Sequence, residues 1–361
     1  MQLNKLFLAI SILTITGQGC IKRVNVVTRN EEPILVVEGS ITTDTVPYTV
    51  KLTYSGLIDF SDDIPDQYLE KEATVSISDD LGNVAPLVYK NKGIYETTDP
   101  AYIGKVGRSY HVIVLLKNGK KYISTPEKIK PPIPFSKVNA SFVNIFNLDL
   151  PTYLNVSIDA NDPAGEENYY RWSFYSYIMR QTKGVPCGFG CIQFEYCYQK
   201  FIDKEIRILS DAAINGKEIR NQSVGRCYIY TFGNPYIEIS QLTTTREAYQ
   251  FWKRYQEQLT RTGGILDPLP AAIKGNVYNA SNTSDFALGY FSASSVTSKR
   301  VVLVPYSITN YLLEISAFHF IPEDYIACFD YYPNSLVYPV PGRIYPPPTG
   351  WENAEELKVY W

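Results

Sequence analysis

Six cysteines carry most of the reactive chemistry in this 361-residue sequence, and the first of them stands apart. Cys20 follows a leader in which Lys5 supplies a positive charge, residues 6–16 form an apolar run and residues 17–19 are small or polar. This order is typical of a cleaved export signal, and the apolar run is shorter than the ~20 residues that a membrane-spanning helix needs. A thiol at the cleavage point is the group that bacterial lipoprotein processing acylates. We therefore expect residues 1–19 to be a lipoprotein signal peptide and Cys20 to carry lipid; the alternative is an ordinary secretory signal with an incidental cysteine.

The other cysteines offer disulfide or metal chemistry. Export favours disulfides, and the C-x3-C-x5-C spacing of three of them differs from the C-x2-C pairs that are usual at zinc sites. We therefore predict disulfides and no metal centre, with one thiol left over and the pairing undetermined. The candidates are Cys187, Cys191, Cys197, Cys227 and Cys328.

A group of carboxylates offers a second kind of chemistry. Asp159, Asp162, Glu166 and Glu167 fall within one expected loop, and hard oxygen ligands in a loop can hold calcium. Their spacing does not follow the EF-hand pattern, so we prefer the interpretation in which they shape the turn and face water. Calcium remains a weaker alternative. Paired carboxylates also serve glycoside hydrolysis, but only at a separation that a sequence does not give.

Catalytic motifs are otherwise missing from the sequence. The two histidines, His111 and His319, each lie in an apolar stretch without a nucleophile motif nearby. No G-x-S-x-G elbow, H-E-x-x-H pair or phosphate-binding glycine loop is present. The sequence thus predicts a protein that is not an enzyme, with no catalytic residues and no cofactor.

The composition indicates which elements must position these residues. Hydrophobic residues make up 45% of the chain and charged residues 20%, which is typical of a globular protein. A net charge of −3 gives no electrostatic reason to expect nucleic acid as a partner. Tyrosine occurs 30 times, spread along the chain, and tyrosine favours strands. Alternating segments such as residues 48–54, and the hairpin signal Asn118-Gly119, predict a mainly β fold.

Short strands separated by turn signals favour two β-sandwich domains of the immunoglobulin or fibronectin kind. We expect a lipidated tether at 20–31, a first sandwich at 32–130 and a second, β-rich domain at 135–345. Pro131, Pro132 and Pro134 mark the boundary between the two domains. A proline-rich tail is expected at 346–361.

One amphipathic helix is predicted inside the second domain, at about 244–262. Thr244 and Glu247 have the spacing of a capping box, and Gly263-Gly264 is a helix stop. An apolar stripe on one face is expected to pack against the second sheet, with an exposed ligand-binding stripe as the alternative. The stripe consists of Ala248, Phe251, Trp252, Tyr255 and Leu259.

Several segments resemble a known family. They are Ile34-Leu35-Val36-Val37-Glu38-Gly39, Tyr48-Thr49-Val50, Gly93-Ile94-Tyr95, Gly107-Arg108-Ser109-Tyr110, residues 162–170, residues 263–270, Gly275-Asn276-Val277, Leu288-Gly289-Tyr290-Phe291 and Ser294-Ser295-Val296. Together they resemble the Bacteroidota lipoproteins grouped as a domain of unknown function (DUF 4249). The resemblance implies an outer-membrane lipoprotein whose gene commonly lies beside that of a TonB-dependent transporter. It implies no known activity. Basic residues after Cys20 (Lys22, Arg23) leave the periplasmic and cell-surface faces undecided.

The function expected from the sequence is that of a lipid-anchored accessory or ligand-binding partner of a TonB-dependent transporter. The expected binding surface is the loop from Cys187 to Cys197, with Phe189, Tyr196 and Tyr198 as binding residues, because disulfides would stiffen a long insertion. Two alternatives remain open. One is a carboxylate-dependent envelope hydrolase acting on glycans, and the other is a structural scaffold in the envelope.

Overall fold

The structure is a computed structural model that describes residues 33–56, 64–143, 153–181, 185–188, 191–193, 196–228, 232–261, 272–302, 344–345, 352–353 and 359–360. One compact unit begins at Ile34 and contains all of these residues except Pro33. The predicted signal peptide, Cys20 and the tether lie outside the described residues.

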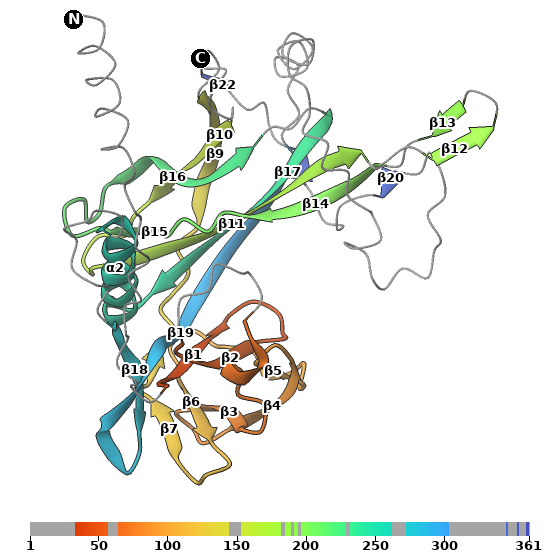
Figure 1. The fold of residues 1–361 in the computed structure, drawn as a ribbon. Helices are drawn as coiled ribbons and strands as arrows, with labels where there is room; N and C mark the ends of the chain where they lie inside the picture. Colours follow the sequence, from red (N-terminus) through yellow and green to blue (C-terminus); the bar gives the residue numbers. More distant parts are fainter. Residues whose placement is uncertain are drawn as a thin grey trace, which may run out of the picture. The chain divides into compact units, whose positions relative to one another are not determined.

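Nine strands form a closed β-barrel (Figure 1). The barrel closes because the first strand pairs with the last, in parallel and in a register that joins Val36 to Leu288. In pairing order the strands are β1 (Leu35–Thr42), β2 (Thr49–Tyr54), β5 (Ile94–Thr97), β4 (Val84–Asn91), β3 (Thr74–Asp79), β6 (Ser109–Leu115), β7 (Lys121–Ser124), β18 (Lys274–Asn279) and β19 (Asn282–Val302).

The prediction of two β-sandwich domains is wrong, although the mainly β class is confirmed. The predicted first domain ended at residue 130, but β18 and β19 follow helix α2 and complete the barrel. Alternation of apolar and polar residues shows that one face of a strand is buried. It does not show which strand lies alongside, and a barrel and a sandwich share the same alternation.

The barrel core follows directly from this alternation. On β1, Leu35, Val37 and Ile41 are buried, and their side chains belong to one hydrophobic cluster with residues of the other barrel strands. The hairpin predicted at Asn118-Gly119 is present between β6 and β7, where Gly119 adopts a φ of 85° that favours glycine. Burial of these aliphatic and tyrosine side chains is the main stabilising term of the barrel.

Strand β19 continues beyond the barrel into a second set of strands (Figure 1). Its distal half pairs with β17, so the same sheet runs on from the barrel. The further strands of this sheet are β17 (Phe232–Thr244), β11 (Tyr169–Gln181), β14 (Tyr196–Ile202), β15 (Arg207–Ser210), β20 (Ile344–Tyr345) and β21 (Glu352–Asn353), with β8 (Glu127–Lys128) paired to β6.

A separate sheet of four strands covers one face of this extension, and a second core lies between them. Tyr170, Trp172 and Phe174 of β11 are buried there together with aliphatic residues of the smaller sheet. The smaller sheet consists of β16 (Glu218–Tyr228), β10 (Tyr153–Asn161), β9 (Phe135–Val143) and β22 (Val359–Tyr360), while β12 (Val185–Gly188) and β13 (Cys191–Gln193) form a hairpin by themselves.

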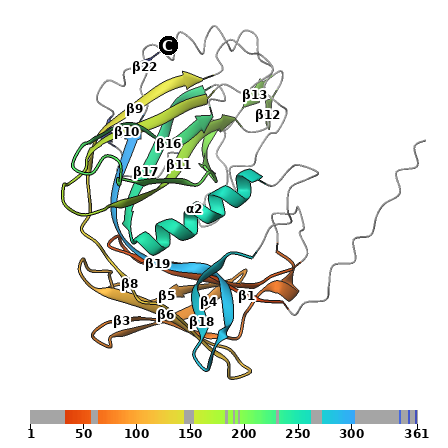
Figure 2. The ribbon, with the colours of Figure 1, turned by 90° about the vertical axis from the view of Figure 1, so that its left-hand side faces the viewer.

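Helix α2 (Arg246–Arg261) is present where the sequence predicted a helix, and a short 3-10 helix η1 spans Asp66–Tyr68. Figure 2 shows α2 between β19 at the barrel and the strands β11 and β17. The helix begins one residue later than the predicted capping box implies, because Thr244 ends β17 and Thr245 is the cap. Within the described ranges, no helix has the length and apolar character needed to span a membrane.

Candidate functional site

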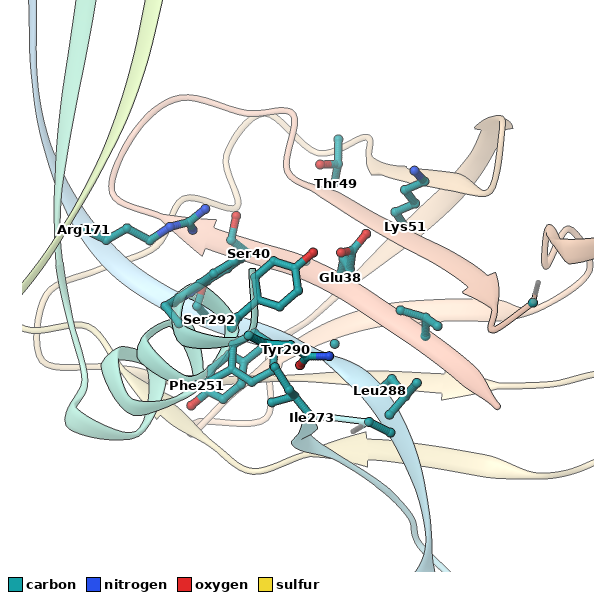
Figure 3. A pocket seen from close by; sticks show the side chains of 18 residues that line it. Glu38, Ser40, Thr49, Lys51, Arg171, Phe251, Ile273, Leu288, Tyr290 and Ser292 are labelled. Atoms are coloured by element: carbon teal, nitrogen blue, oxygen red, sulfur yellow. The ribbon is translucent and has the colours of Figure 1, made fainter. Parts of the chain in front are cut away.

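A cavity of about 720 Å³ lies between the outer face of the barrel and helix α2 (Figure 3). This volume falls within the usual range of small-molecule sites. The lining combines an aromatic wall with a small number of charged and hydroxyl groups. Its residues are Val36, Glu38, Gly39, Ser40, Thr49, Lys51, Gly56, Arg171, Phe251, Trp252, Tyr255, Gln258, Ala272, Ile273, Leu288, Gly289, Tyr290 and Ser292.

The floor of the cavity is the outer face of three adjacent barrel strands. Successive side chains of a strand point to opposite sides, so the residues between the buried ones on β1 face the cavity. Glu38 is one of these residues. Its neighbours across the sheet are Lys51 on β2 and Tyr290 on β19, which also line the cavity. A row of polar and aromatic groups therefore crosses the floor from strand to strand.

Two glycines allow the floor strands to approach closely. Gly289 on β19 has a φ of 81°, and a Cβ atom there would lie 2.3 Å from the carbonyl oxygen of Val37. A Cβ atom on Gly275 would lie 1.5 Å from the carbonyl oxygen of Gly289. Any larger residue would force apart the β1–β19 and β18–β19 contacts that hold the floor together.

The other wall of the cavity comes from the aromatic stripe of α2. Phe251 is buried against Tyr290, with ring centroids 4.9 Å apart, and Trp252 lies beside it at the cavity. Farther along the helix Tyr255 is 40% exposed and Leu259 is 53% exposed. The stripe packs against the second sheet only in part, because Trp252 stacks on Arg171 of β11 while other residues face elsewhere, so that expectation is only partly right. Its first turn packs onto the barrel strand β19, and its second half opens towards the cavity and solvent.

A buried carboxylate fixes the start of the helix beneath the cavity. Glu127 of β8 accepts hydrogen bonds from the hydroxyls of Thr245 and Tyr290. The Thr245 hydroxyl in turn accepts a hydrogen bond from the backbone N–H of Ala248 at 3.2 Å, which caps the helix. Burial raises the pKa of Glu127 to about 7. One acid therefore links the barrel, the helix and the aromatic floor.

Arg171 brings a positive charge to the cavity from β11. Its neighbours Tyr170 and Trp172 point into the second core, so Arg171 points to the opposite face, towards α2. Its guanidinium stacks on the Trp252 ring, with Cζ 3.7 Å from the ring centroid. Burial lowers the pKa of Arg171 to about 10, so the group still carries its charge at neutral pH.

The predicted acidic loop is organised by Asp162, which is buried. Its carboxylate accepts hydrogen bonds from the Tyr170 hydroxyl and, at 2.9 Å, from the backbone N–H of Gly216. Asp211 lies beside it, held by the backbone N–H of Asn168 at 2.9 Å. Burial and the charge of Asp162 raise the pKa of Asp211. Through these hydrogen bonds the two carboxylates connect the loop that contains Asp162 and Asn168 with the loop that contains Asp211 and Gly216, so their role is structural.

The other predicted loop carboxylates also have structural or solvent-facing positions. Asp159 accepts a hydrogen bond from the backbone N–H of Asn221 at 2.8 Å, Glu167 accepts one from the Tyr169 hydroxyl, and Glu166 is exposed. Among the described residues, no group of three or more acidic, histidine or cysteine side chains is placed to hold a metal ion. The calcium alternative therefore has no support in this part of the chain.

The predicted cysteine loop lies largely outside the described side chains. The backbones of Cys187, Cys191 and Cys197 belong to β12, β13 and β14, and those of Tyr196 and Tyr198 to β14. Phe189 and Cys328 lie outside the described residues, so these disulfide and binding assignments stay predictions. Cys227 is fully buried in the second core, where burial raises the pKa of its thiol to about 12.

The sequence analysis named the helix residues Phe251, Trp252 and Tyr255, with ligand binding as the alternative for their stripe, but it missed the other residues that form the cavity. Two signals were available: Glu38 interrupts an apolar run, and Arg171 is the only cation in the aromatic stretch Tyr169-Tyr170-Arg171-Trp172. A charged residue in such a setting needs either solvent or a partner. Nothing local, however, indicated that β1, β11 and α2 meet at one place.

The fold and the cavity thus define a mainly β chain whose closed barrel carries a helix-covered cavity on its side. Residues 21–300 match the family described as a domain of unknown function, DUF4249, and the chain belongs to this family. The resemblance inferred from the sequence is confirmed to that extent. The family match assigns no enzymatic activity. A comparison with curated proteins finds no match.

Several segments that carry the family resemblance surround the cavity. Residues 34–39 form part of β1, residues 48–50 lead into β2, residues 275–277 lie in β18 and residues 288–291 lie in β19. Seven residues of these segments line the cavity: Val36, Glu38, Gly39, Thr49, Leu288, Gly289 and Tyr290. The segment 263–270 lies outside the described residues.

Proposed function

We propose that this chain is an outer-membrane lipoprotein that binds a small-molecule ligand in the cavity beneath α2 and acts beside a TonB-dependent transporter. The observation that carries the binding role is the cavity itself, because about 720 Å³ of space lies between an aromatic wall and a few polar groups. Ligand sites in proteins have this composition, with apolar surface for affinity and few polar groups for orientation.

The anchoring and transporter roles are supported by the sequence. Cys20 stands at the expected cleavage point of an export signal, and lipid on that residue would hold the domain at a membrane. The resemblance to DUF 4249 lipoproteins implies a transporter gene nearby. A protein that captures a ligand at the membrane and passes it to a transporter would need both features.

Occupancy of the cavity can be tested by filling it. Ser40→Trp places an indole on the floor, where Ser40 and Ser292 are neighbours across β1 and β19. The matched control is Val84→Trp, at a position on β4 that is 54% exposed and outside the cavity lining. Each protein is purified from native membranes and denatured, and the released small molecules are identified by mass spectrometry. We expect the same molecule from the wild type and from Val84→Trp and its loss from Ser40→Trp. Equal release from all three proteins would contradict binding in this cavity.

The transporter role is tested with the tagged full-length protein, solubilised with detergent from outer membranes. We expect a TonB-dependent transporter to co-purify in a fixed ratio with the wild type, and the Cys20→Ser variant to be lost from the membrane fraction. A wild-type protein that purifies alone would argue against partnership with a transporter. Retention of Cys20→Ser in the membrane would argue against the lipid anchor.

A further inference from the structure

The charge balance of the cavity indicates what kind of ligand it takes. Three lining residues are charged: Arg171 and Lys51 are cations, and Glu38 is an anion. Figure 3 shows Arg171 on one side and Lys51 with Glu38 on the other. Glu38 and Lys51 are cross-strand neighbours, so their opposite charges offset one another locally. The lining residues therefore carry a net positive charge, which comes from Arg171.

No carboxylate of the described residues neutralises Arg171. Among the described residues no acidic group lies within ion-pair distance of its guanidinium, and no described group accepts a hydrogen bond from it. Its contact is the stacking on Trp252, which fixes the plane of the guanidinium and leaves its N–H edge for another group. A partly buried cation without a partner is costly, and an anion beside it would remove that cost.

The residues around Arg171 indicate the shape and polarity of the rest of the ligand. Trp252, Tyr255 and Tyr290 present aromatic surface to the cavity, and Ile273 and Leu288 add aliphatic surface. Flat apolar molecules pack well against such a wall. The hydroxyls of Ser40, Thr49 and Ser292 and the amide of Gln258 supply the remaining polar groups at the lining.

We infer that the cavity takes an amphipathic organic monoanion, with its oxyanion on the N–H edge of Arg171 and its flat apolar body against Trp252 and Tyr290. Arginine binds carboxylate, sulfonate and phosphate oxygens through paired N–H donors, so the oxyanion is the shared chemistry of these ligands. This inference rests on the proposed function, because it assigns a ligand class to the same cavity.

The probe for this inference is 2-naphthoate, a flat monoanion, and its control is 2-naphthamide, the same ring system without charge. Binding is measured by equilibrium dialysis with the full-length lipoprotein in lipid nanodiscs, after subtraction of empty nanodiscs. We expect the wild type to bind 2-naphthoate at least about tenfold more tightly than Arg171→Gln does, because charge-assisted hydrogen bonds are lost. Both proteins should bind 2-naphthamide with affinities within about twofold of one another.

Two further variants separate the role of Arg171 from general effects. Arg246→Gln removes an exposed cation from the first turn of α2, outside the cavity lining, and should bind both probes like the wild type. Arg171→Lys keeps the charge without the planar fork and should retain part of the preference for 2-naphthoate. Arg171→Gln is expected to melt at or above the wild-type temperature, since it removes a partly buried charge that no described carboxylate neutralises.

The outcomes distinguish this inference from the proposed function. If Arg171→Gln binds 2-naphthoate as tightly as the wild type, the oxyanion site is wrong. If the wild type binds both probes equally and Ser40→Trp abolishes both, the cavity binds ligands but does not select anions. If the wild type binds neither probe, this ligand class is wrong, and the release experiment with Ser40→Trp decides separately whether the cavity binds a ligand.

Discussion

Glu127 occupies a position in which a single proton affects three elements. The residue is 2% exposed, and its carboxylate accepts hydrogen bonds from the helix cap Thr245 and from Tyr290 on the cavity floor. Burial outweighs these hydrogen bonds and raises the pKa of Glu127 from the ordinary value of 4.5 to about 7. The folded protein therefore holds a proton at pH values where the unfolded chain has released it.

The free energy of unfolding should consequently fall as the pH rises from about 4.5 to about 7. Below this window both states are protonated, and above it the folded state must bury a charge. The shift corresponds to a loss of about 3 kcal/mol across the window. Glu127→Gln keeps a polar side chain of the same shape that does not ionise, so this part of the pH dependence should disappear.

The measurement is urea unfolding of wild type and Glu127→Gln at about pH 4.5, 6 and 7.5. Subtracting the two curves removes the contribution of other titrating groups, including Asp211 and His111. We expect the difference in stability to shift in favour of the variant by about 3 kcal/mol as the pH rises. If the free energies of unfolding of the two proteins change in parallel with pH, Glu127 does not titrate in this window.

Strand β19 is the element on which barrel closure depends. Its proximal half pairs with β1 and β18 to close the barrel, and its distal half pairs with β17 in the sheet that leads to Arg171 on β11. Gly289 lies at the closing contact, where the backbone has a positive φ and the carbonyl oxygen of Val37 is close. The cavity floor and its side wall are positioned by this one strand.

Gly289→Ala should therefore be strongly destabilising, by about 3 kcal/mol or more, because strain at the positive φ adds to a collision with the Val37 backbone. Gly119→Ala is the matched control. Its φ of 85° is similar, but no atom lies within 4 Å of the added Cβ, so only the conformational strain of about 1 kcal/mol is expected. Chemical denaturation of both variants measures the difference. An equal loss of stability in Gly289→Ala and Gly119→Ala would mean that the β1–β19 contact tolerates a side chain.

At the scale of the whole molecule, the barrel is assembled from two segments that residues 125–273 separate in the chain. Residues 35–124 supply seven strands, and β18 and β19 supply the other two after α2. Without these two strands, β1 and β7 would each lose a hydrogen-bonded neighbour, and the core would lose Val277 and Phe291.

A fragment covering residues 32–130, the domain that the sequence suggested, should therefore fail to fold by itself. We expect it to show no cooperative unfolding transition by circular dichroism and little dispersion of its NMR amide signals. A fragment covering 32–302 contains all nine barrel strands and should unfold cooperatively. Cooperative unfolding of the 32–130 fragment would show that the seven strands form a stable domain without closure.

The sequence by itself determined the local features of this protein. Alternation on β2 separated inward from outward residues, Asn118-Gly119 placed a hairpin, and the apolar stripe placed α2, because each of these signals depends on residues close together in the chain. The family membership also followed from sequence segments alone.

Only the tertiary structure decided how these elements pair and what they enclose. The turn at Asn215-Gly216 shows the difference: Gly216 has a φ of 74°, as in a hairpin turn, but the flanking strands β15 and β16 pair with β11 and β10. Pairing of β1 with β19 joins residues about 250 positions apart, and no local pattern specifies such a partner. The cavity, the stacked Arg171 and the buried Glu127 exist only because that non-local pairing brings β1, β19, β11 and α2 together.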